Sequence, residues 1–319
     1  MLKKMSIRKI MVASLSLVAL FLVYLMPSNT ENLNIEKTSI EYLYTNEVEV
    51  VYLLDSNDYV SRTTIKKNGD NVLDTAHDII SALTIDGNRS DIIPNGFKAI
   101  IPSGTEILDI NIADDLITVD LSRDVLMINA LYEEKMIESI IYSLTNIEGI
   151  DKVKLLVEGD NFSKLPNSGK TLPLILDRSY GINKNYDLIN TSNIESYTVY
   201  YVSKINDDSY YVPVTKYINS KGEEKIKVII EELSTSPIYE DNLMSFLNAE
   251  VSLINYNIEN DILNLNFNNS IFMDRGSSEI LEEVIYTIGL SCIDNYEVTD
   301  VSISVENKQI YKNLSKILE

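Results

Sequence analysis

Residues 133–145 read EEKMIESIIYSLT, and residues 279–288 read EILEEVIYTI. In both stretches the apolar residues follow the i, i+1, i+4, i+5, i+8 spacing that places them on one face of an α-helix. The two patterns superpose at an offset of 144 residues, which matches Tyr142 with Tyr286. We therefore predict two copies of one amphipathic helix, each with its apolar face buried in its own copy.

The segments around these two helices repeat in the same order. Alternating apolar and polar residues, typical of strands with one buried face, precede and follow each helix. The opening strands around Tyr52 and Tyr200 also match, at an offset of 148. Five ordered matches indicate a duplicated module. Besides the long helices and the opening strands, the matched pairs are 79–83 with 229–233, 116–121 with 262–267, and 153–158 with 301–306.

Each copy mixes strands with two helices. Asn68-Gly69 is a turn signal, and Asp70 or Asn71 is a plausible N-cap for the helix that follows. This mixture predicts an α+β fold of two tandem α/β-sandwich modules, with the helices packed on one face of a mixed sheet. In the first copy we predict elements at about 48–54, 59–66, 72–84, 98–101, 106–112, 116–121, 130–146 and 152–158.

The N-terminus predicts a membrane anchor. Residues 10–26 are 17 uncharged, mostly apolar residues that follow a basic cluster, Lys3, Lys4, Arg8 and Lys9. This length reaches the lower end of a transmembrane helix, and no A-x-A cleavage site or lipobox cysteine follows it. The positive-inside rule then places the rest of the chain outside the cytoplasm. A cleaved signal peptide is the alternative, and it leads to the same compartment.

These observations divide the chain into six segments. The stretch between the copies carries Pro166 and Pro173, and its last polar part is the predicted linker. The segments are a basic cytoplasmic tail (1–9), the anchor (10–26), a spacer (27–46), the first module (47–182), the linker (183–195) and the second module (196–319).

The charge of the chain excludes one class of partner. The net charge is −21, and all the acidic residues lie beyond residue 26. Such a surface repels phosphate backbones and anionic lipid headgroups, so we expect no nucleic-acid binding and no flat binding to a membrane.

Little in the sequence indicates catalysis or a cofactor. His77 and Cys292 are the only histidine and cysteine, which excludes a multi-histidine metal site and an internal disulfide. Asp55 and Asp58 resemble the start of a calcium loop, but the following Tyr59 and Val60 do not fit it, so a hairpin turn is the better interpretation. We therefore expect no metal, no cofactor and no enzymatic activity; a cell-wall hydrolase is the weakest alternative.

Tyrosines crowd the opening hairpin of the second copy. Residues 210–218 have strand chemistry, and Pro213 within them suggests an edge strand or a bulge. Strand propensity alone explains many of these tyrosines, but tyrosine surfaces also favour contacts with proteins or sugars. The candidate contact residues are Tyr197, Tyr201, Tyr211 and Tyr217.

A stretch of the first copy resembles a known family. Residues 99–122 read AIIPSGTEILDINIADDLITVDLS, and residues 140–159 read IIYSLTNIEGIDKVKLLVEG. With the P-x-G-T turn at Pro102, Gly104 and Thr105, they resemble the GerM domain, a sporulation and germination module of spore-forming bacteria. The resemblance covers most of 48–159 and, more weakly, 197–310. The second copy lacks the P-x-G-T turn, so its contacts at that loop would differ.

The resemblance implies a fold similar to the ring-building modules of secretion-type channels. It also implies a role in endospore formation, in the space between the mother-cell and forespore membranes, where proteins of this kind are thought to support a channel complex. The implied partners are proteins of that complex or further copies of the chain, and Pro102, Gly104 and Thr105 are candidate contact residues. Relatives are often lipoproteins, whereas here the helix itself would be the anchor. A peptidoglycan- or carbohydrate-binding module that uses the tyrosine hairpin remains the alternative.

Overall fold

The computed structural model describes residues 48–69, 71–206, 208–219, 221–235, 242–274 and 278–312. The predicted anchor, the spacer and the N-cap candidate Asp70 lie outside these residues. Within them, no helix has the length and apolar character needed to cross a bilayer. The other N-cap candidate, Asn71, does cap the first helix, because its side chain accepts a hydrogen bond from the Asp74 N–H.

The first copy follows the predicted order of strands and helices. Its third strand is shorter than predicted, because only Phe97 and Lys98 pair with β1. The elements are β1 (Val48–Asp55), β2 (Val60–Lys66), α2 (Val72–Leu83), η1 (Ser90–Ile92), β3 (Phe97–Lys98), β4 (Ile107–Ala113), β5 (Leu116–Leu121), η2 (Arg123–Met127), α3 (Glu133–Leu144), β6 (Lys152–Val157) and β7 (Asp160–Asn161). Two short elements follow, η3 (Arg178–Tyr180) and β8 (Asn185–Asp187).

The second copy repeats this series with a longer opening hairpin. Its elements are β9 (Ile194–Ile205), β10 (Asp208–Asn219), α4 (Lys225–Ser234), β11 (Leu253–Glu259), β12 (Ile262–Phe267), η4 (Asn269–Ile271), α5 (Glu282–Asn295), β13 (Asp300–Val305) and β14 (Lys308–Tyr311). The structure is therefore a tandem mixed α/β fold with four α-helices among the described residues.

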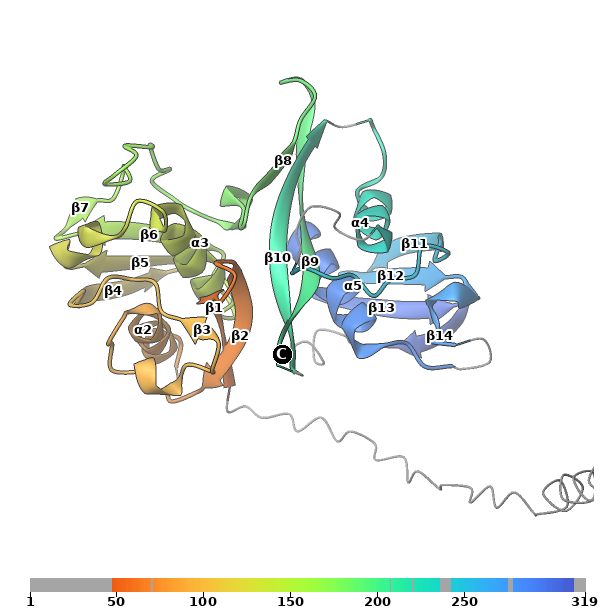
Figure 1. The fold of residues 1–319 in the computed structure, drawn as a ribbon, viewed down its shortest axis with the longest axis horizontal. Coiled ribbons are helices and arrows are strands. Elements are labelled where there is room, and N and C mark those ends of the chain that lie inside the picture. The colour runs from red at the N-terminus through yellow and green to blue at the C-terminus, as the bar shows by residue number, and fades with distance from the viewer. Residues whose placement is uncertain are drawn as a thin grey trace, which may run out of the picture. The chain divides into compact units, whose positions relative to one another are not determined.

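The strands are divided among three sheets rather than the two that the sequence predicts. Each copy has its own four-stranded sheet, in the order β4-β5-β6-β7 or β11-β12-β13-β14. In both, the central strands are parallel and the outer pairs antiparallel. The two opening hairpins join in a third, six-stranded sheet, where β2 meets β10 at Arg62 and Tyr211 (Figure 1). The two copies therefore share a sheet, and the described residues form one compact unit.

The position of Pro213 corrects the expectation of an edge strand. β10 is an inner strand, because β9 lies along one side and β2 and β8 lie on the other. Its pairing with β9 continues through Pro213 without a bulge. The Pro213 carbonyl instead accepts a hydrogen bond of 2.8 Å from the side chain of Asn183, at a position between the β2 and β8 pairings. Proline is tolerated there because no neighbouring strand needs its missing N–H.

The structure shifts the predicted match of the long helices by one helical turn. In the first copy the Ser143 hydroxyl accepts a hydrogen bond of 2.8 Å from the Tyr52 N–H. In the second copy the Ser291 hydroxyl accepts the same bond, at 2.9 Å, from the Tyr200 N–H. Ser143 therefore corresponds to Ser291 and not to Thr287, so the helices share the offset of 148 found for the opening strands. A stripe with helical period looks nearly the same after a shift of four residues, which explains the error.

Both predicted helix faces are buried. In α3 the apolar residues of the predicted stripe are inaccessible to solvent. The second helix begins at Glu282, so Ile280 and Leu281 of its predicted stripe precede it, and the stripe residues within α5 are nearly inaccessible. α3 packs against β1 in the first copy, and α5 packs against β9 in the second. The long helices thus hold the two opening hairpins at corresponding positions, which determines where the copies meet.

Candidate functional site at the junction of the two copies

Two equivalent tyrosines meet where the copies join. Tyr52 projects from β1 and Tyr200 from β9, and their hydroxyl oxygens are 2.9 Å apart. Both side chains are fully buried. Contact between equivalent residues is the mark of an interface with approximate two-fold symmetry. The antiparallel pairing of the equivalent strands β2 and β10 has the same symmetry.

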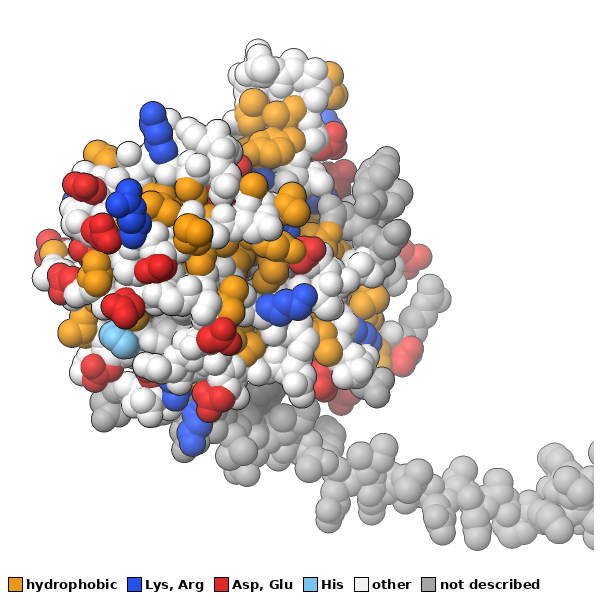
Figure 2. Space-filling view, turned by 60° about the vertical axis from the view of Figure 1, so that its left-hand side comes forward, with side chains coloured by type: hydrophobic (Ala, Val, Ile, Leu, Met, Phe, Trp, Pro, Cys, Tyr) orange, Lys and Arg blue, Asp and Glu red, His pale blue; other side chains and the backbone are white. Residues whose placement is uncertain are grey.

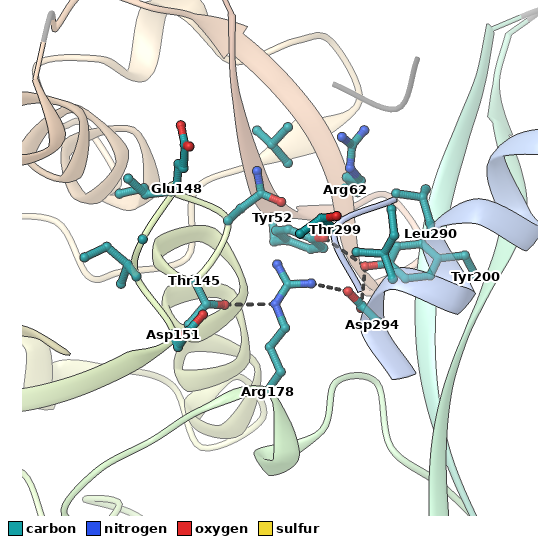
Figure 3. A pocket seen from close by; sticks show the side chains of 16 residues that line it. Tyr52, Arg62, Thr145, Glu148, Asp151, Arg178, Tyr200, Leu290, Asp294 and Thr299 are labelled. Atoms are coloured by element: carbon teal, nitrogen blue, oxygen red, sulfur yellow. Dashed lines mark hydrogen bonds and ion pairs between the residues drawn. The ribbon is translucent and has the colours of Figure 1, made fainter. Parts of the chain in front are cut away.

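An arginine from the stretch between the copies completes this junction. Arg178 begins η3, and its guanidinium forms an ion pair with Asp294 of α5. Its Nε donates to the Thr145 hydroxyl at 3.0 Å, and the guanidinium lies 5.0 Å from the ring centre of Tyr142. Figure 3 shows the guanidinium between Thr145 and Asp294, with the bonds of Arg178 drawn to both.

The second oxygen of Asp294 binds a tyrosine. The Tyr200 hydroxyl donates to it at 2.8 Å, so the Tyr52 hydroxyl is left to donate to Tyr200. The resulting series Tyr52, Tyr200, Asp294 and Arg178 links β1, β9, α5 and η3. Because the Asp294 side chain is only 4% exposed, removal of a partner would leave a buried charge without compensation.

The electrostatics of the junction favour the ion pair. Burial alone would lower the pKa of Arg178, but the Asp294 carboxylate beside it raises that pKa above its ordinary value. Burial, reinforced by Asp294, raises the pKa of Tyr200 well above its usual range. Arg178 thus stays charged and Tyr200 stays protonated at neutral pH, which preserves the donors and acceptors of the series.

A cavity of about 430 Å³ opens beside this series. Its lining includes Arg62 and Arg178 together with the carboxylates of Glu148, Asp151 and Asp294. Figure 3 shows these side chains coming from both copies around the Arg178 guanidinium. The cavity lining therefore carries charges of both signs. The charges of Arg178 and Asp294 neutralise each other in their ion pair.

A buried carboxylate makes a second contact between the copies. Asp55, at the end of β1, accepts hydrogen bonds from the N–H groups of Asn57 and Tyr59, which form the predicted hairpin turn. It also accepts a bond of 2.8 Å from the Tyr210 hydroxyl of β10. Burial raises the pKa of Asp55, while Tyr210 and the other donors oppose that rise. The turn interpretation of Asp55 and Asp58 is confirmed.

The predicted linker also contributes to the junction. Asn183 accepts from the Val60 N–H at 2.9 Å and donates to the Val60 carbonyl at 2.8 Å. Lys184 forms an ion pair with Glu138 of α3 at 2.6 Å. β8 then pairs in parallel with the end of β10. These bonds attach residues 183–187 to both copies.

The comparisons with known proteins agree with this architecture. The sequence model of the family described as "Germane: Sporulation and spore germination" matches residues 50–162 and 198–311. The chain belongs to this family, the GerM family. It is 32% identical over 263 residues to "Spore germination protein GerM" of Bacillus subtilis (strain 168), covering 81% of this chain and 71% of that protein. It is also 31% identical to the solved structure "Tandem GerMN domains of the sporulation protein GerM from Bacillus subtilis", with a TM-score of 0.74 over 82% of this chain and 91% of that one.

The P-x-G-T turn, which carries the GerM resemblance, lies in the first copy. It lines two hollows there and is not part of the lining of the junction cavity. The Thr105 N–H donates to the Pro102 carbonyl at 3.2 Å, as a tight turn requires. Gly104 has a φ of +83°, which only glycine adopts without strain. Pro102 is buried, while Gly104 is exposed. A contact role for these residues stays a prediction.

The candidate tyrosines of this GerM-family hairpin do not share one exposed face. Tyr197 and Tyr201 are buried, since 4% and 1% of their surfaces are exposed. The ring of Tyr211 stacks on Tyr286, and that of Tyr217 stacks on Tyr186. Tyr197 and Tyr201 are therefore core residues in this structure, and a contact role for Tyr211 and Tyr217 stays a prediction.

The single histidine and cysteine lie apart from the junction series. His77 is exposed on α2, and Cys292 is buried in α5, where burial raises the pKa of its thiol to about 12. Among the described residues, no group of three or more histidine, cysteine and acidic side chains could hold a metal ion.

Sequence reasoning missed the residues that join the copies. Arg178 lies outside the segments that repeat, so no pattern marks it. Asp294 belongs to the second long helix, whose match with the first was predicted at an offset of 144 instead of 148 residues. The match of Tyr52 with Tyr200 was the available signal, because a buried tyrosine needs a hydrogen-bond partner.

Proposed function

We propose that this GerM-family chain is a non-enzymatic, extracytoplasmic protein that acts as an assembly component during sporulation. In this proposal it supports the channel complex between mother cell and forespore, and residues 10–26 anchor it in the membrane as a single-pass helix. Its membership in a sporulation and germination family supports the setting.

One observation carries the assembly role. The charged and tyrosine side chains at the junction bind one another, and this joins the copies. A unit of this kind holds two similar modules at a fixed spacing, which suits a protein that positions others. The edge strands β4 and β11 end the two four-stranded sheets and offer backbone groups to which a partner strand could be added.

A replacement experiment tests this proposal. The full-length chain is expressed in a Bacillus subtilis strain that lacks its GerM, and a variant without residues 10–26 serves as the control. We expect the full-length chain to restore sporulation, to be recovered with the membranes and to copurify with channel proteins. Cleavage of purified muropeptides by the chain would contradict the non-enzymatic role. Restored sporulation without any copurifying protein would contradict the assembly role.

A second candidate function is binding of peptidoglycan or another carbohydrate. The observation that favours it is the stack of Tyr186 on Tyr217, with ring centres 4.8 Å apart and Tyr186 61% exposed. Aromatic faces of this kind suit sugar rings. Purified peptidoglycan should then retain the chain, and Tyr186→Ala and Tyr217→Ala should abolish retention. The control is Tyr256→Ala, a tyrosine on β11 that is partly buried.

A further inference from the structure

The P-x-G-T turn of the first copy separates two hollows of different chemistry. A hollow of about 370 Å³ lies on one side and is lined by Gly104, Thr105 and Glu106. A hollow of about 550 Å³ lies on the other side and is lined by Pro102 and Ser103. Ile85 lines both hollows, so the two adjoin.

The smaller hollow is polar and acidic. Its lining includes the carboxylates of Asp86 and Glu106, the His77 imidazole and the hydroxyl groups of Ser81 and Thr105. The Thr105 hydroxyl oxygen is buried and has no hydrogen-bond partner in the described part of the chain. Two carboxylates with no cationic side chain among the lining residues favour a positively charged group.

The larger hollow is mainly apolar. Leu54, Ile100 and Ile128 form its walls, and Lys98 adds one positive charge to the lining. Met127 lines it with 80% of its surface exposed, and nearby Leu131 is 78% exposed. Exposed apolar side chains beside a hollow of this size mark an interaction surface. Figure 2 shows hydrophobic side chains gathered between acidic ones on the face that includes the first copy.

We propose that the two hollows form one docking surface for a segment of a partner protein that carries a large apolar side chain and, close to it, a lysine or arginine. The apolar side chain fills the larger hollow against Met127, and the cation enters the smaller hollow between Asp86 and Glu106. Charge complementarity determines this choice, because the acidic body of the chain attracts basic partners and repels acidic ones. The inference deepens the proposed assembly role and rests on it.

The second copy provides a matched comparison. Around β4 and β5, each residue of the first copy corresponds to the residue 146 positions later in the second. One bond shows this match, since the Glu106 N–H donates to the Ser122 side chain and the Ser252 N–H donates to the Asn268 side chain. By the same offset Met127 corresponds to Met273, which is 52% exposed. The backbone bond of the turn is repeated there, since the Val251 N–H donates to the Asn248 carbonyl at 2.9 Å, but the side chains differ, because the Asn248 side chain also accepts from the Glu250 N–H. Met273 is thus an exposed methionine at the equivalent position, beside a turn that lacks the proline and glycine of the first copy.

Photo-crosslinking tests the docking surface. Benzoylphenylalanine replaces Met127 or, as the control, Met273 in the full-length chain in sporulating cells, and mass spectrometry sequences the attached segment. We expect a protein adduct at Met127 whose attached segment has a large apolar residue within about one helical turn of a lysine or arginine. At Met273 we expect at least tenfold less adduct. Because both methionines are exposed, neither replacement should prevent folding, and thermal unfolding of each variant checks this.

Charge variants test the polar hollow separately. Asp86→Asn with Glu106→Gln should lower the adduct yield at Met127 about fivefold, since two partly exposed ion pairs together contribute about 1 kcal/mol. Asp114→Asn, in the turn at the far end of β4, is the matched control and should leave the yield unchanged.

The following outcomes of the crosslinking experiment would overturn the inference. Equal adducts at Met127 and Met273, adducts only at Met273, or no adduct at either would remove the surface. So would an attached segment that is acidic or lacks a large apolar residue, comes from a second copy of this chain, or is a glycan. The assembly role itself fails if sporulation is restored without any copurifying protein in the replacement experiment, so the two failures are distinguishable.

Discussion

The two copies agree in their backbone contacts and differ in their charges. In both, a serine of the long helix accepts a hydrogen bond from the N–H of the junction tyrosine, Ser143 for Tyr52 and Ser291 for Tyr200. Three residues after each serine the copies diverge, because the first has Asn146 and the second Asp294. Only Asp294 meets an arginine, and that arginine comes from the stretch after the first copy. The serine-to-tyrosine contact is therefore common to both copies, whereas the ion pair with Arg178 uses the long helix of the second copy.

Loss of the ion pair should produce the largest effect. Arg178→Ala removes the cation beside the buried Asp294 carboxylate and leaves it the hydrogen bond from the Tyr200 hydroxyl, so we expect the free energy of unfolding to fall by about 3 to 5 kcal/mol. Urea unfolding of residues 45–319, followed by circular dichroism, measures it. Lys170→Ala removes an exposed ion pair with Glu134 and should cost at most about 1 kcal/mol. Equal losses for the two variants would contradict the role assigned to Arg178.

The two serines test the equivalence of the long helices. Ser143→Ala and Ser291→Ala each leave a buried tyrosine N–H without its acceptor, and each should cost about 1 to 3 kcal/mol. Thr287→Val should cost less than about 1 kcal/mol, because the Thr287 hydroxyl binds carbonyls of its own helix that keep their helical bonds. The same urea measurement applies. A larger loss for Thr287→Val than for Ser291→Ala would contradict the match of Ser143 with Ser291 and support the match with Thr287.

The tyrosine pair tests whether the symmetric contact contributes on its own. Tyr52→Phe and Tyr200→Phe should be non-additive, with a coupling free energy of about 1 kcal/mol in a double-mutant cycle, because the two hydroxyls bind each other. Tyr200→Phe should be the more costly single change, since it also removes a donor to Asp294. Strict additivity of the two changes would mean that the hydroxyl contact has no energetic role.

Alkaline pH should reveal a smaller effect in the second copy. Burial raises the pKa of Tyr201 from 10.0 to about 12. Between these values the unfolded chain has lost this proton and the folded chain retains it, so the contribution of Tyr201 is complete below pH 10 and is lost as the pH rises toward 12. The free energy of unfolding of Tyr201→Phe should therefore depend less on pH than that of the original chain. Just above pH 10 the two should differ in this pH-dependent loss by less than about 1 kcal/mol. Urea midpoints across this range, with tyrosinate absorbance, measure the change; an unchanged pH dependence would contradict it.

Local patterns allowed much of the fold to be predicted. Alternation located most strands within one or two residues, and the helical stripe identified the buried faces of α3 and α5. The pairing of β2 with β10 was beyond prediction, because a strand's own sequence does not name its neighbour in a shared sheet. Helical periodicity also left the match of the long helices ambiguous by four residues, and the bonds of Ser143 and Ser291 resolve it.

The junction could be predicted only in part. The repeat related Tyr52 to Tyr200, but strand alternation does not tell which face of an opening hairpin meets another copy. Arg178 lies in a stretch with Pro166 and Pro173 that resembles a spacer, so its burial against Tyr142 depends on tertiary structure alone. The tyrosines of β9 and β10 were candidates for a surface because composition does not distinguish a buried ring from an exposed one.

Hydrogen exchange, measured by mass spectrometry on the full chain, tests most directly whether the two copies form one cooperative unit through their junction. We predict that Arg178→Ala raises the exchange rates of β1 and α3 and those of β9 and α5 by the same factor, because loss of the junction destabilises both copies together. Faster exchange confined to η3, or to one copy while the other keeps its protection, would contradict a shared unit.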